Sequence, residues 1–96
     1  IISDEEFFKS RYDRCAESDK KFIFAMVKCG ELPCTISNIA TNLHKPVKSI
    51  SPTRAQLINK GLVYAARYGE LDFTVPEFTG FIQRQEDYTK WCSTEA

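Results

Sequence analysis

Two short segments, the second with a period of two, interrupt a chain that otherwise follows helical spacing. Residues 71–75 alternate apolar with polar side chains, and a mostly apolar run over residues 62–67 precedes them. Alternation at period two predicts a strand, and Tyr68 and Gly69 between the two runs can form a tight turn. The sequence therefore predicts one β-hairpin inside a mainly helical chain.

Apolar residues at helical spacing, bounded by polar caps and by glycine or proline, predict five helices around this hairpin. In the first helix, Ser3 and Glu6 have the spacing of a capping box. In the last helix, Pro76 occupies the first helical position, where its missing N–H is tolerated. The predicted helices cover residues 4–15, the stretch from the cap Ser18 to Gly30, the stretch from the cap Ser37 through Leu43, the stretch from about Ser49 to Gly61, and about 76–90.

The apolar stripes of these helices define a predicted core, which begins with the six consecutive apolar residues 22–27. Over the third and fourth helices and just beyond, the inward-facing residues are Ile39, Ala40, Leu43, Ile50, Leu57, Ile58 and Leu62. The outward-facing residues of the same region are Lys48, Ser49, Ser51, Thr53, Gln56 and Asn59. These exposed side chains carry hydrogen-bonding groups that can approach base edges or phosphates in a major groove.

The order of the predicted elements is that of a winged helix-turn-helix domain. The helix-turn-helix covers about 36–61, with its turn at residues 44–46, and the hairpin over about 62–75 forms a short wing. Flanking helices precede it and follow it, the latter over about 76–90. We therefore expect a single domain over residues 1–96, mainly α with a small β-hairpin.

Charge is distributed unevenly along the chain, although 13 Lys and Arg balance 13 Asp and Glu. Residues 32–69 contain five basic residues and no acidic residue. A partner senses the charges within about 8–10 Å, so this segregation matters more than the total. The acid-free stretch coincides with the helix-turn-helix and the first wing strand, which favours a DNA-binding face. Its candidate residues are Lys45, Lys48, Ser49, Ser51, Thr53, Arg54, Gln56, Asn59, Lys60, Arg67 and Tyr68.

Several residues keep two interpretations from the sequence alone. Arg54 lies one turn from Ile50 and from Ile58, so it can contact a phosphate or bond within the domain. Tyr68, like Tyr64, can cover an edge of the core or lie on a sugar-phosphate backbone. Near the C-terminus, Tyr88 and Trp91 can dock on the first helix or form a site that a parent protein covers.

Three runs, together with the stretch before them, resemble the C-terminal winged-helix domain of prokaryotic AAA-type P-loop ATPases. The runs are Ile36-Ser37-Asn38-Ile39-Ala40 through Leu43, Ser49 through Tyr64, and Phe73-Thr74-Val75-Pro76-Glu77-Phe78. The stretch Phe8-x-x-Arg11-Tyr12-x-Arg14, followed by residues 19–26, is similar to the segment that leads into that domain, so the resemblance covers about residues 5–85. It implies a fold that is DNA-binding or DNA-binding-like. It also implies an ATPase elsewhere in a longer parent protein, where ATP and Mg²⁺ would bind, and the first residue, Ile1 rather than Met, suits a piece of such a protein.

Catalytic chemistry is not expected in this chain, and neither is a metal or a cofactor. Its four glycines are isolated, so none forms a phosphate-binding loop. A cysteine nucleophile would need a histidine as its base, and the single histidine, His44, lies in the predicted turn. The four cysteines lack a Cys-x-x-Cys pair and are typical of reduced thiols in a cytoplasmic protein. Cys15 and Cys29 lie on apolar faces, whereas Cys34 and Cys92 are expected nearer the surface.

A membrane protein is excluded by the longest apolar run, residues 22–27, because a spanning helix needs about 20 apolar residues. The leading hypothesis from the sequence is a non-catalytic winged-helix module that binds duplex DNA at the end of a P-loop ATPase. The alternative is a regulatory winged helix that packs on the ATPase domain or on a partner protein, because the fold hosts both functions.

Overall fold

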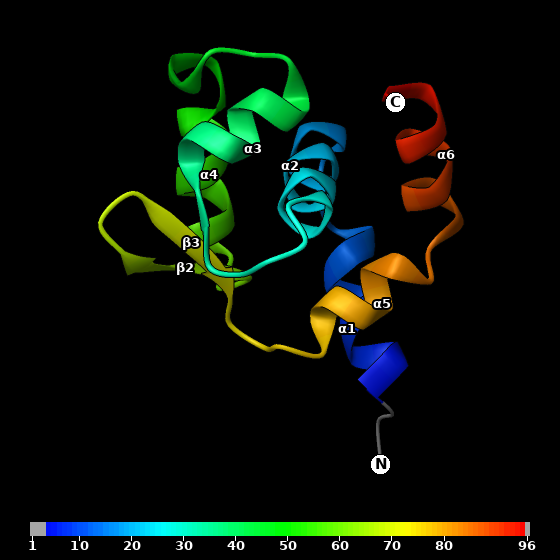
Figure 1. The fold of residues 1–96 in the computed structure, drawn as a ribbon. Helices are drawn as coiled ribbons and strands as arrows, with labels where there is room; N and C mark the ends of the chain where they lie inside the picture. Colours follow the sequence, from blue (N-terminus) through cyan, green and yellow to red (C-terminus); the bar gives the residue numbers. More distant parts are fainter. Residues whose placement is uncertain (1–3, 96) are drawn as a thin grey trace.

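The computed structural model describes the backbone of residues 4–95 and the side chains of residues 5–94. Within that range helices predominate, and three short strands form one antiparallel sheet (Figure 1). The elements are, in chain order, α1 (Asp4–Asp13), α2 (Glu17–Lys28), β1 (Cys34–Thr35), α3 (Ile36–Leu43), α4 (Val47–Asn59), β2 (Val63–Arg67), β3 (Glu70–Phe73), α5 (Phe78–Gln83) and α6 (Glu86–Glu95).

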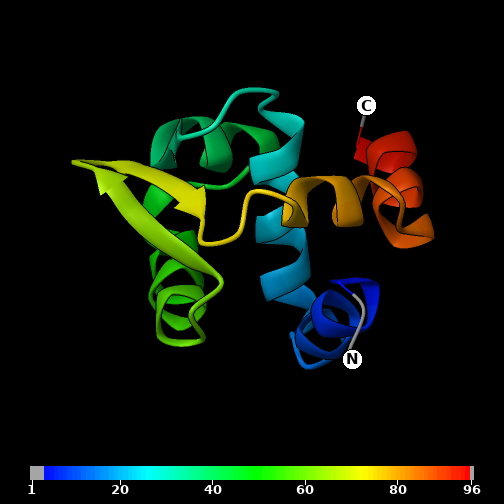
Figure 2. The ribbon, with the colours of Figure 1, turned by 90° about the horizontal axis from the view of Figure 1, so that it is seen from below.

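Helix α2 lies at the centre of the molecule because residues 22–27 are apolar on every side. All six of these side chains are buried. A helix that is apolar all round has to be covered all round. Helices α3, α4, α5 and α6 each pack against it. Figures 1 and 2 show α2 with α3 and α4 on one side and with α5 and α6 on the other.

The predicted core residues of α3, α4 and the start of the hairpin do point inward. Five of them are buried and two are half-buried and pack against the buried set. The buried residues are Ile39, Ala40, Ile50, Leu57 and Leu62, and the half-buried ones are Leu43 and Ile58. The helical periodicity therefore assigned the inward face of this region correctly.

The sheet has one strand more than the predicted hairpin. Strands β2 and β3 pair antiparallel with Val63 opposite Phe73, and the register shifts between Ala65 and Arg67, which is a β-bulge at Ala66. Strand β1 pairs with the other edge of β3, so the order is β1-β3-β2. The expectation that Cys34 lies near the surface is wrong, because this pairing buries its side chain to 5% exposure.

Four predicted helix starts are displaced by two residues. Those of α2, α3 and α4 lie two residues earlier than predicted, whereas α5 begins at Phe78, so Pro76 is not its first residue. Helix α2 begins at Glu17 rather than after Ser18, because the Asp19 carboxylate accepts a hydrogen bond from the Ala16 N–H. Helix α3 is capped by Thr35 instead of Ser37, and the Thr35 hydroxyl accepts from the Asn38 N–H at 3.1 Å. The predicted cap Ser3 lies outside the described residues.

Helix α4 begins two residues before the predicted Ser49. Its first residue is Val47, so Pro52 lies inside the helix instead of in the first turn. Pro46 takes the capping position with an extended backbone, although its side chain provides no cap. The preceding turn closes at His44, whose φ of 57° is left-handed, and the two helices therefore meet through three residues.

The predicted C-terminal helix over 76–90 is in fact two helices, α5 and α6, separated at residues 84–85. Phe78, Phe81 and Ile82 of α5 are buried as predicted. Helix α6 docks on α2 through Trp91, whose ring centroid lies 5.8 Å from that of Phe24. The alternative that Trp91 docks on the first helix is therefore wrong, although Tyr12 of α1 does donate a hydrogen bond to Asp87 at 3.0 Å.

Within the described part of the chain, none of the helices combines the length and the apolar character that crossing a bilayer requires.

Candidate nucleic-acid interface

An open groove lies between α4 and the turn that joins β2 to β3. This α4–hairpin groove has a volume of about 720 Å³. The lining residues come from α3, α4 and the hairpin, and they are Ile36, Val47, Ser51, Arg54, Ala65, Arg67, Tyr68 and Gly69. Figures 1 and 2 show the hairpin projecting beside α4, away from α5 and α6.

Helical spacing places one row of α4 along this groove. Val47, Ser51 and Arg54 are separated by four and three residues, so their side chains lie on one side of the helix. Ile50 and Leu57, on the adjacent side, are buried against the core and fix the rotation of α4. The Arg54 side chain is half-buried as a result, with its neighbours in the row at the surface.

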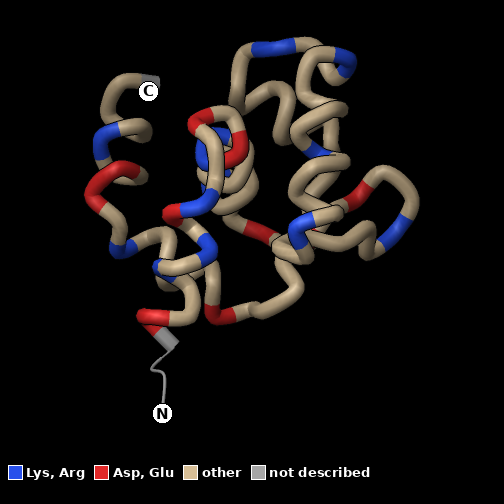
Figure 3. The backbone as a smooth tube through the Cα atoms, turned by 180° about the vertical axis from the view of Figure 1, so that it is seen from behind, with Lys and Arg blue, Asp and Glu red and all other residues tan. Residues whose placement is uncertain are grey.

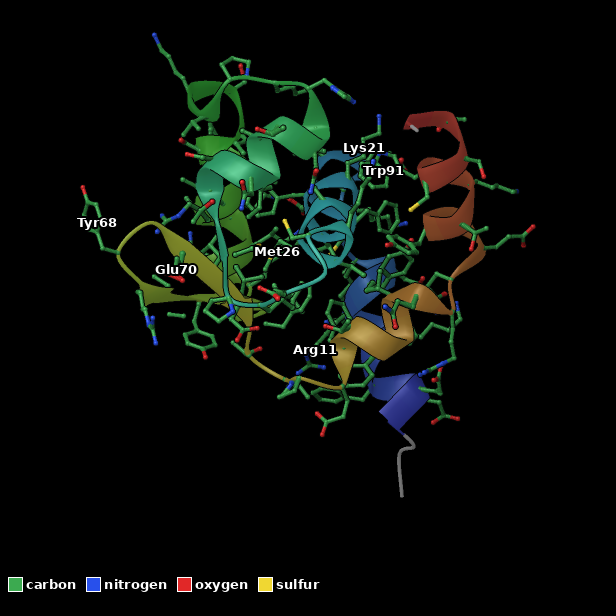
Figure 4. All side chains as sticks on the ribbon, viewed as in Figure 1. Arg11, Lys21, Met26, Tyr68, Glu70 and Trp91 are labelled. Carbon is green, nitrogen blue, oxygen red and sulfur yellow. The ribbon has the colours of Figure 1, made fainter. Side chains whose placement is uncertain are left out.

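The hairpin turn supplies the other wall of the α4–hairpin groove. Gly69 has a φ of 74°, which glycine adopts without the strain that a side chain would bring. Tyr68 beside it is fully exposed and projects away from the body of the molecule (Figure 4). The alternative in which Tyr68 covers an edge of the core is therefore wrong.

The basic residues around this groove have no carboxylate partner among the described side chains. Within residues 5–94, none of Lys45, Lys48, Arg54 and Arg67 forms an ion pair, whereas four other basic residues do. The groove lining contains two arginines and no acidic residue. Glu70 lies opposite Arg67 across the hairpin and reduces the positive field at that end. Figure 3 shows basic residues along α4 and its preceding turn, with an acidic residue near the hairpin.

The remaining predicted site residues are distributed around α4. Lys45 is exposed in the turn before the helix, and Thr53 is half-buried on the side away from the hairpin. The exposed residues on the outer side of α4 are Lys48, Ser49, Gln56 and Asn59. The structure therefore brings Ser51, Arg54, Arg67 and Tyr68 together in the groove and places the other predicted site residues outside its lining.

Lys60 differs from the other predicted site residues because it forms an ion pair within the domain. Its Nζ lies 2.6 Å from Oδ2 of Asp19, a carboxylate whose side chain is completely buried. A buried carboxylate that loses its cation pays a large desolvation cost. The ion pair argues against the prediction that Lys60 anchors a phosphate, since that contact would leave Asp19 uncompensated.

The sequence reasoning missed the apolar part of the groove and its acidic neighbour. Ile36, Val47 and Ala65 line the groove beside the arginines. Val47 was missed because the helix was predicted to begin two residues later. Glu70 could have been identified from the hairpin itself, because it is the first residue after the two-residue turn and so faces Arg67.

The described lining of the groove offers hydrogen-bonding groups and positive charge. The Ser51 hydroxyl donates to the Val47 carbonyl at 3.0 Å, so it is not poised as a nucleophile. Across the described residues, no group of three His, Cys, Asp or Glu side chains converges closely enough to hold a metal ion.

A family model with the description "Domain of unknown function (DUF8462)" matches residues 5–82. The match includes every element from α1 through β3 and most of α5, and it ends before α6. It therefore contains all residues that line the α4–hairpin groove. No curated protein and no solved structure matches the chain.

Proposed function

The chain belongs to the DUF8462 family, and we propose that it is a non-catalytic winged-helix module that binds duplex DNA. The observation that carries the proposal is the α4–hairpin groove, where Arg54 and Arg67 line one surface without an acidic residue among the lining side chains. The element order supports it as well, because α3, a three-residue turn, α4 and a hairpin follow one another as in a helix-turn-helix with a wing.

In this proposal α4 enters the major groove with its outer polar side chains toward the bases. Ser49, Gln56 and Asn59 provide hydrogen-bonding groups there. The phosphate contacts come from Lys45, Lys48, Arg54 and Arg67, four cations near the groove that form no ion pair within residues 5–94. Four such contacts give a salt slope of at most about −3.6, since each neutralised phosphate contributes about −0.9. Binding is then weak and is lost at high salt.

The wider context of the module is also a proposal and follows from the resemblance to AAA-type ATPases. The module would form the C-terminal part of a cytoplasmic P-loop ATPase, whose ATPase domain binds ATP and Mg²⁺. That ATPase domain would then be its partner within the same parent chain.

Titration of a fluorescent duplex of about 20 base pairs at about 50 mM salt tests the proposal by anisotropy. The wild-type domain is expected to bind with a dissociation constant between about 1 and 100 µM. Lys48→Glu and Arg67→Glu are each expected to abolish measurable binding. Lys21→Glu is the matched control, because Lys21 is an exposed lysine of α2 beside Trp91, on the side away from the hairpin (Figure 4).

Two results would overturn the DNA proposal for this domain. One is the absence of binding by the wild-type domain at about 50 mM salt. The other is an equal loss of affinity in Lys21→Glu and Lys48→Glu, because the binding would then follow total charge and not the α4–hairpin groove.

The apolar lining of the groove favours a second candidate, a protein-interaction surface. Val47 and Tyr68 are both exposed, and Ile36 and Ala65 line the same groove. A protein contact that uses these residues would be insensitive to salt and sensitive to Val47→Asp. Binding of DNA would instead fall with salt and tolerate Val47→Ala, which removes apolar area without changing charge, so a salt series and the Val47→Ala variant separate the two functions.

A further inference from the structure

An apolar pocket lies between α1, the residues just after α4 and the start of α5. This α1–α5 pocket has a volume of about 130 Å³. Its apolar walls are the side chains of Phe7, Phe8, Leu62, Val75 and Phe78. A cavity of about 150 Å³ with apolar walls holds a benzene ring. The α1–α5 pocket therefore has room for one aromatic ring or for a branched aliphatic group of similar size.

The walls of the α1–α5 pocket belong largely to the core, which fixes their shape. Phe8, Leu62 and Phe78 are buried. The ring centroid of Phe8 lies 5.4 Å from that of Phe78 and 5.6 Å from that of Phe7. Phe7 itself is 38% exposed, so the pocket reaches the surface beside its ring. Ligand sites are typically preformed in this way.

Arg11 supplies the uncommitted side-chain donors in the described lining of this pocket. The other polar side chain there belongs to Thr74, and its hydroxyl donates to the Gly61 carbonyl at 2.8 Å. The Arg11 guanidinium carbon lies 3.8 Å from the ring centroid of Phe7, which orients the group. Figure 4 shows Arg11 on α1 beside the segment that leads from β3 to α5. A guanidinium that stacks on a ring keeps its edge N–H groups free for a carboxylate.

A second hollow adjoins the pocket and adds positive charge. Its volume is about 250 Å³, and its lining residues Arg11, Arg14, Lys60 and Leu62 include two that also line the α1–α5 pocket. Neither arginine forms an ion pair within residues 5–94, whereas Lys60 compensates Asp19. The described lining of both hollows contains no acidic side chain. The two arginines therefore leave uncompensated positive charge next to the apolar walls.

We propose that the α1–α5 pocket binds a small carboxylate that carries one aromatic ring or a branched aliphatic group. The apolar group lies among the phenylalanines, and Arg11 donates two hydrogen bonds to the carboxylate. Arg14 adds a second positive charge from the adjoining hollow, and Lys60 stays paired with Asp19. The pocket shares no lining residue with the α4–hairpin groove, so the inference does not depend on DNA binding.

The ligand class follows from the combination of apolar walls and unpaired cations. An inorganic anion would leave the apolar walls in water, and an uncharged aromatic compound would leave the arginines without a partner. A ring joined to a carboxylate satisfies both. The same chemistry occurs in a free small molecule and in the last residue of a protein chain that ends in phenylalanine, so the ligand has two sources.

Titration of the isotope-labelled protein with hydrocinnamate, followed by NMR, tests the proposal. The amide resonances of Gly61 and Thr74 should shift with a dissociation constant of about 0.1–1 mM, the range of an efficient ligand of this size. The resonance of Gly69, in the α4–hairpin groove, should not move. The neutral amide of hydrocinnamate keeps the ring without the charge and should bind at least about tenfold more weakly.

The arginine variants separate a bound carboxylate from a structural role of Arg11. Arg11→Leu should weaken hydrocinnamate about tenfold but change the affinity for the neutral amide by less than about twofold, which also shows that the pocket is still folded. Arg67→Leu, in the α4–hairpin groove, is the matched control and should change neither affinity. Equal binding of acid and amide by the wild-type protein would overturn the proposal. So would an equal loss in both arginine variants, or the absence of shifts at Gly61 and Thr74 at about 10 mM hydrocinnamate.

A short peptide that ends in phenylalanine distinguishes the two sources. Its last residue has the ring and the carboxylate of hydrocinnamate at the same separation. Tighter binding by the peptide than by hydrocinnamate would identify the C-terminus of a partner chain as the ligand. Weaker binding would identify a free small carboxylate.

Discussion

At the scale of single residues, Asp19 is the buried charge that the fold has to compensate. It is the one charged side chain that is completely buried among those described. Its Oδ2 accepts from Lys60 Nζ and from the Ala16 N–H, whereas Oδ1 has no partner among the described residues. One lysine therefore compensates the charge of a carboxylate that lies against the core and also caps α2.

Removing that lysine is expected to destabilise the protein. Lys60→Met should lower the free energy of unfolding by about 2 kcal/mol, less than the 3–5 kcal/mol of a fully buried pair, because the Lys60 side chain is 31% exposed. In an Asp19→Asn background the same change should cost less than about 1 kcal/mol, since a carboxamide needs no cation. Urea unfolding of the four proteins measures the difference, and equal costs in both backgrounds would show that the pair is not coupled.

The same pair predicts a loss of stability at alkaline pH. The hydrogen bond to Asp19 raises the pKa of Lys60 above its unfolded value of about 10.4. A raised folded-state pKa gives a contribution that is complete below the unfolded value and disappears as the pH rises through the folded value. The stability difference between wild type and Lys60→Met should therefore be constant up to about pH 10 and shrink above it. Lys48→Met, a lysine without an ion pair, is the control, and a difference that grew with pH would contradict the assignment.

Lys60 also shows where reasoning about single residues from the sequence has to stop. The lack of acidic residues over 32–69 pointed to a shared basic surface, and Arg54 and Arg67 do line one groove. The positions of both arginines follow from local spacing on α4 and on the hairpin. The partner of Lys60, in contrast, is 41 residues away in the chain. No local pattern encodes a contact between the first turn of α2 and the end of α4. For that reason the sequence alone predicted Lys60 as a phosphate contact.

At the scale of elements, the existence of helices was predictable and their ends were less so. The stripes of α1 to α4 and the period-two hairpin follow from side-chain spacing. Strand β1 has only two residues and exists because β3 offers an edge, so it carries no periodic signal. The sequence prediction joined α6 to α5 because residues 83–90 contain no glycine or proline that would mark a break, although the chain turns between the two helices so that Trp91 can reach α2.

The docking of α6 leads to a stability prediction. Trp91→Ala removes a ring that is buried against Phe24 and that Lys28 Nζ approaches at 5.4 Å. Large-to-small changes of buried aromatic residues cost about 3–5 kcal/mol, and the lower end is expected for a terminal helix. Tyr68→Ala is the matched control, because its ring is fully exposed and its loss should change stability by less than about 0.5 kcal/mol. Thermal unfolding followed by circular dichroism compares them, and similar stabilities would mean that α6 is not docked in solution.

At the scale of the whole molecule, net charge conceals a spatial separation of charge. The molecule extends over 40 × 29 × 23 Å. The hairpin and α6 lie on opposite sides of α2 (Figures 1 and 2). Screening limits a surface charge to about 8 Å at physiological salt, which is far less than the long dimension. Acidic residues on α6 therefore offset the cations of the α4–hairpin groove in the total without cancelling their field at the groove.

A charge swap at constant net charge separates local from total electrostatics. Lys48→Glu combined with Glu86→Lys keeps the net charge at zero but reverses a cation on α4, and Glu86 is 82% exposed at the start of α6. If the local field governs binding, the double variant should lose duplex DNA as Lys48→Glu does, whereas Glu86→Lys alone should bind within about twofold of wild type. Breaking the exposed pair between Glu86 and Lys90 should cost less than about 0.5 kcal/mol, so folding is not at issue. Anisotropy at about 150 mM salt decides between the two cases. Recovery of binding in the double variant, with tighter binding by Glu86→Lys, would mean that total charge sets the affinity and that the groove does not direct it.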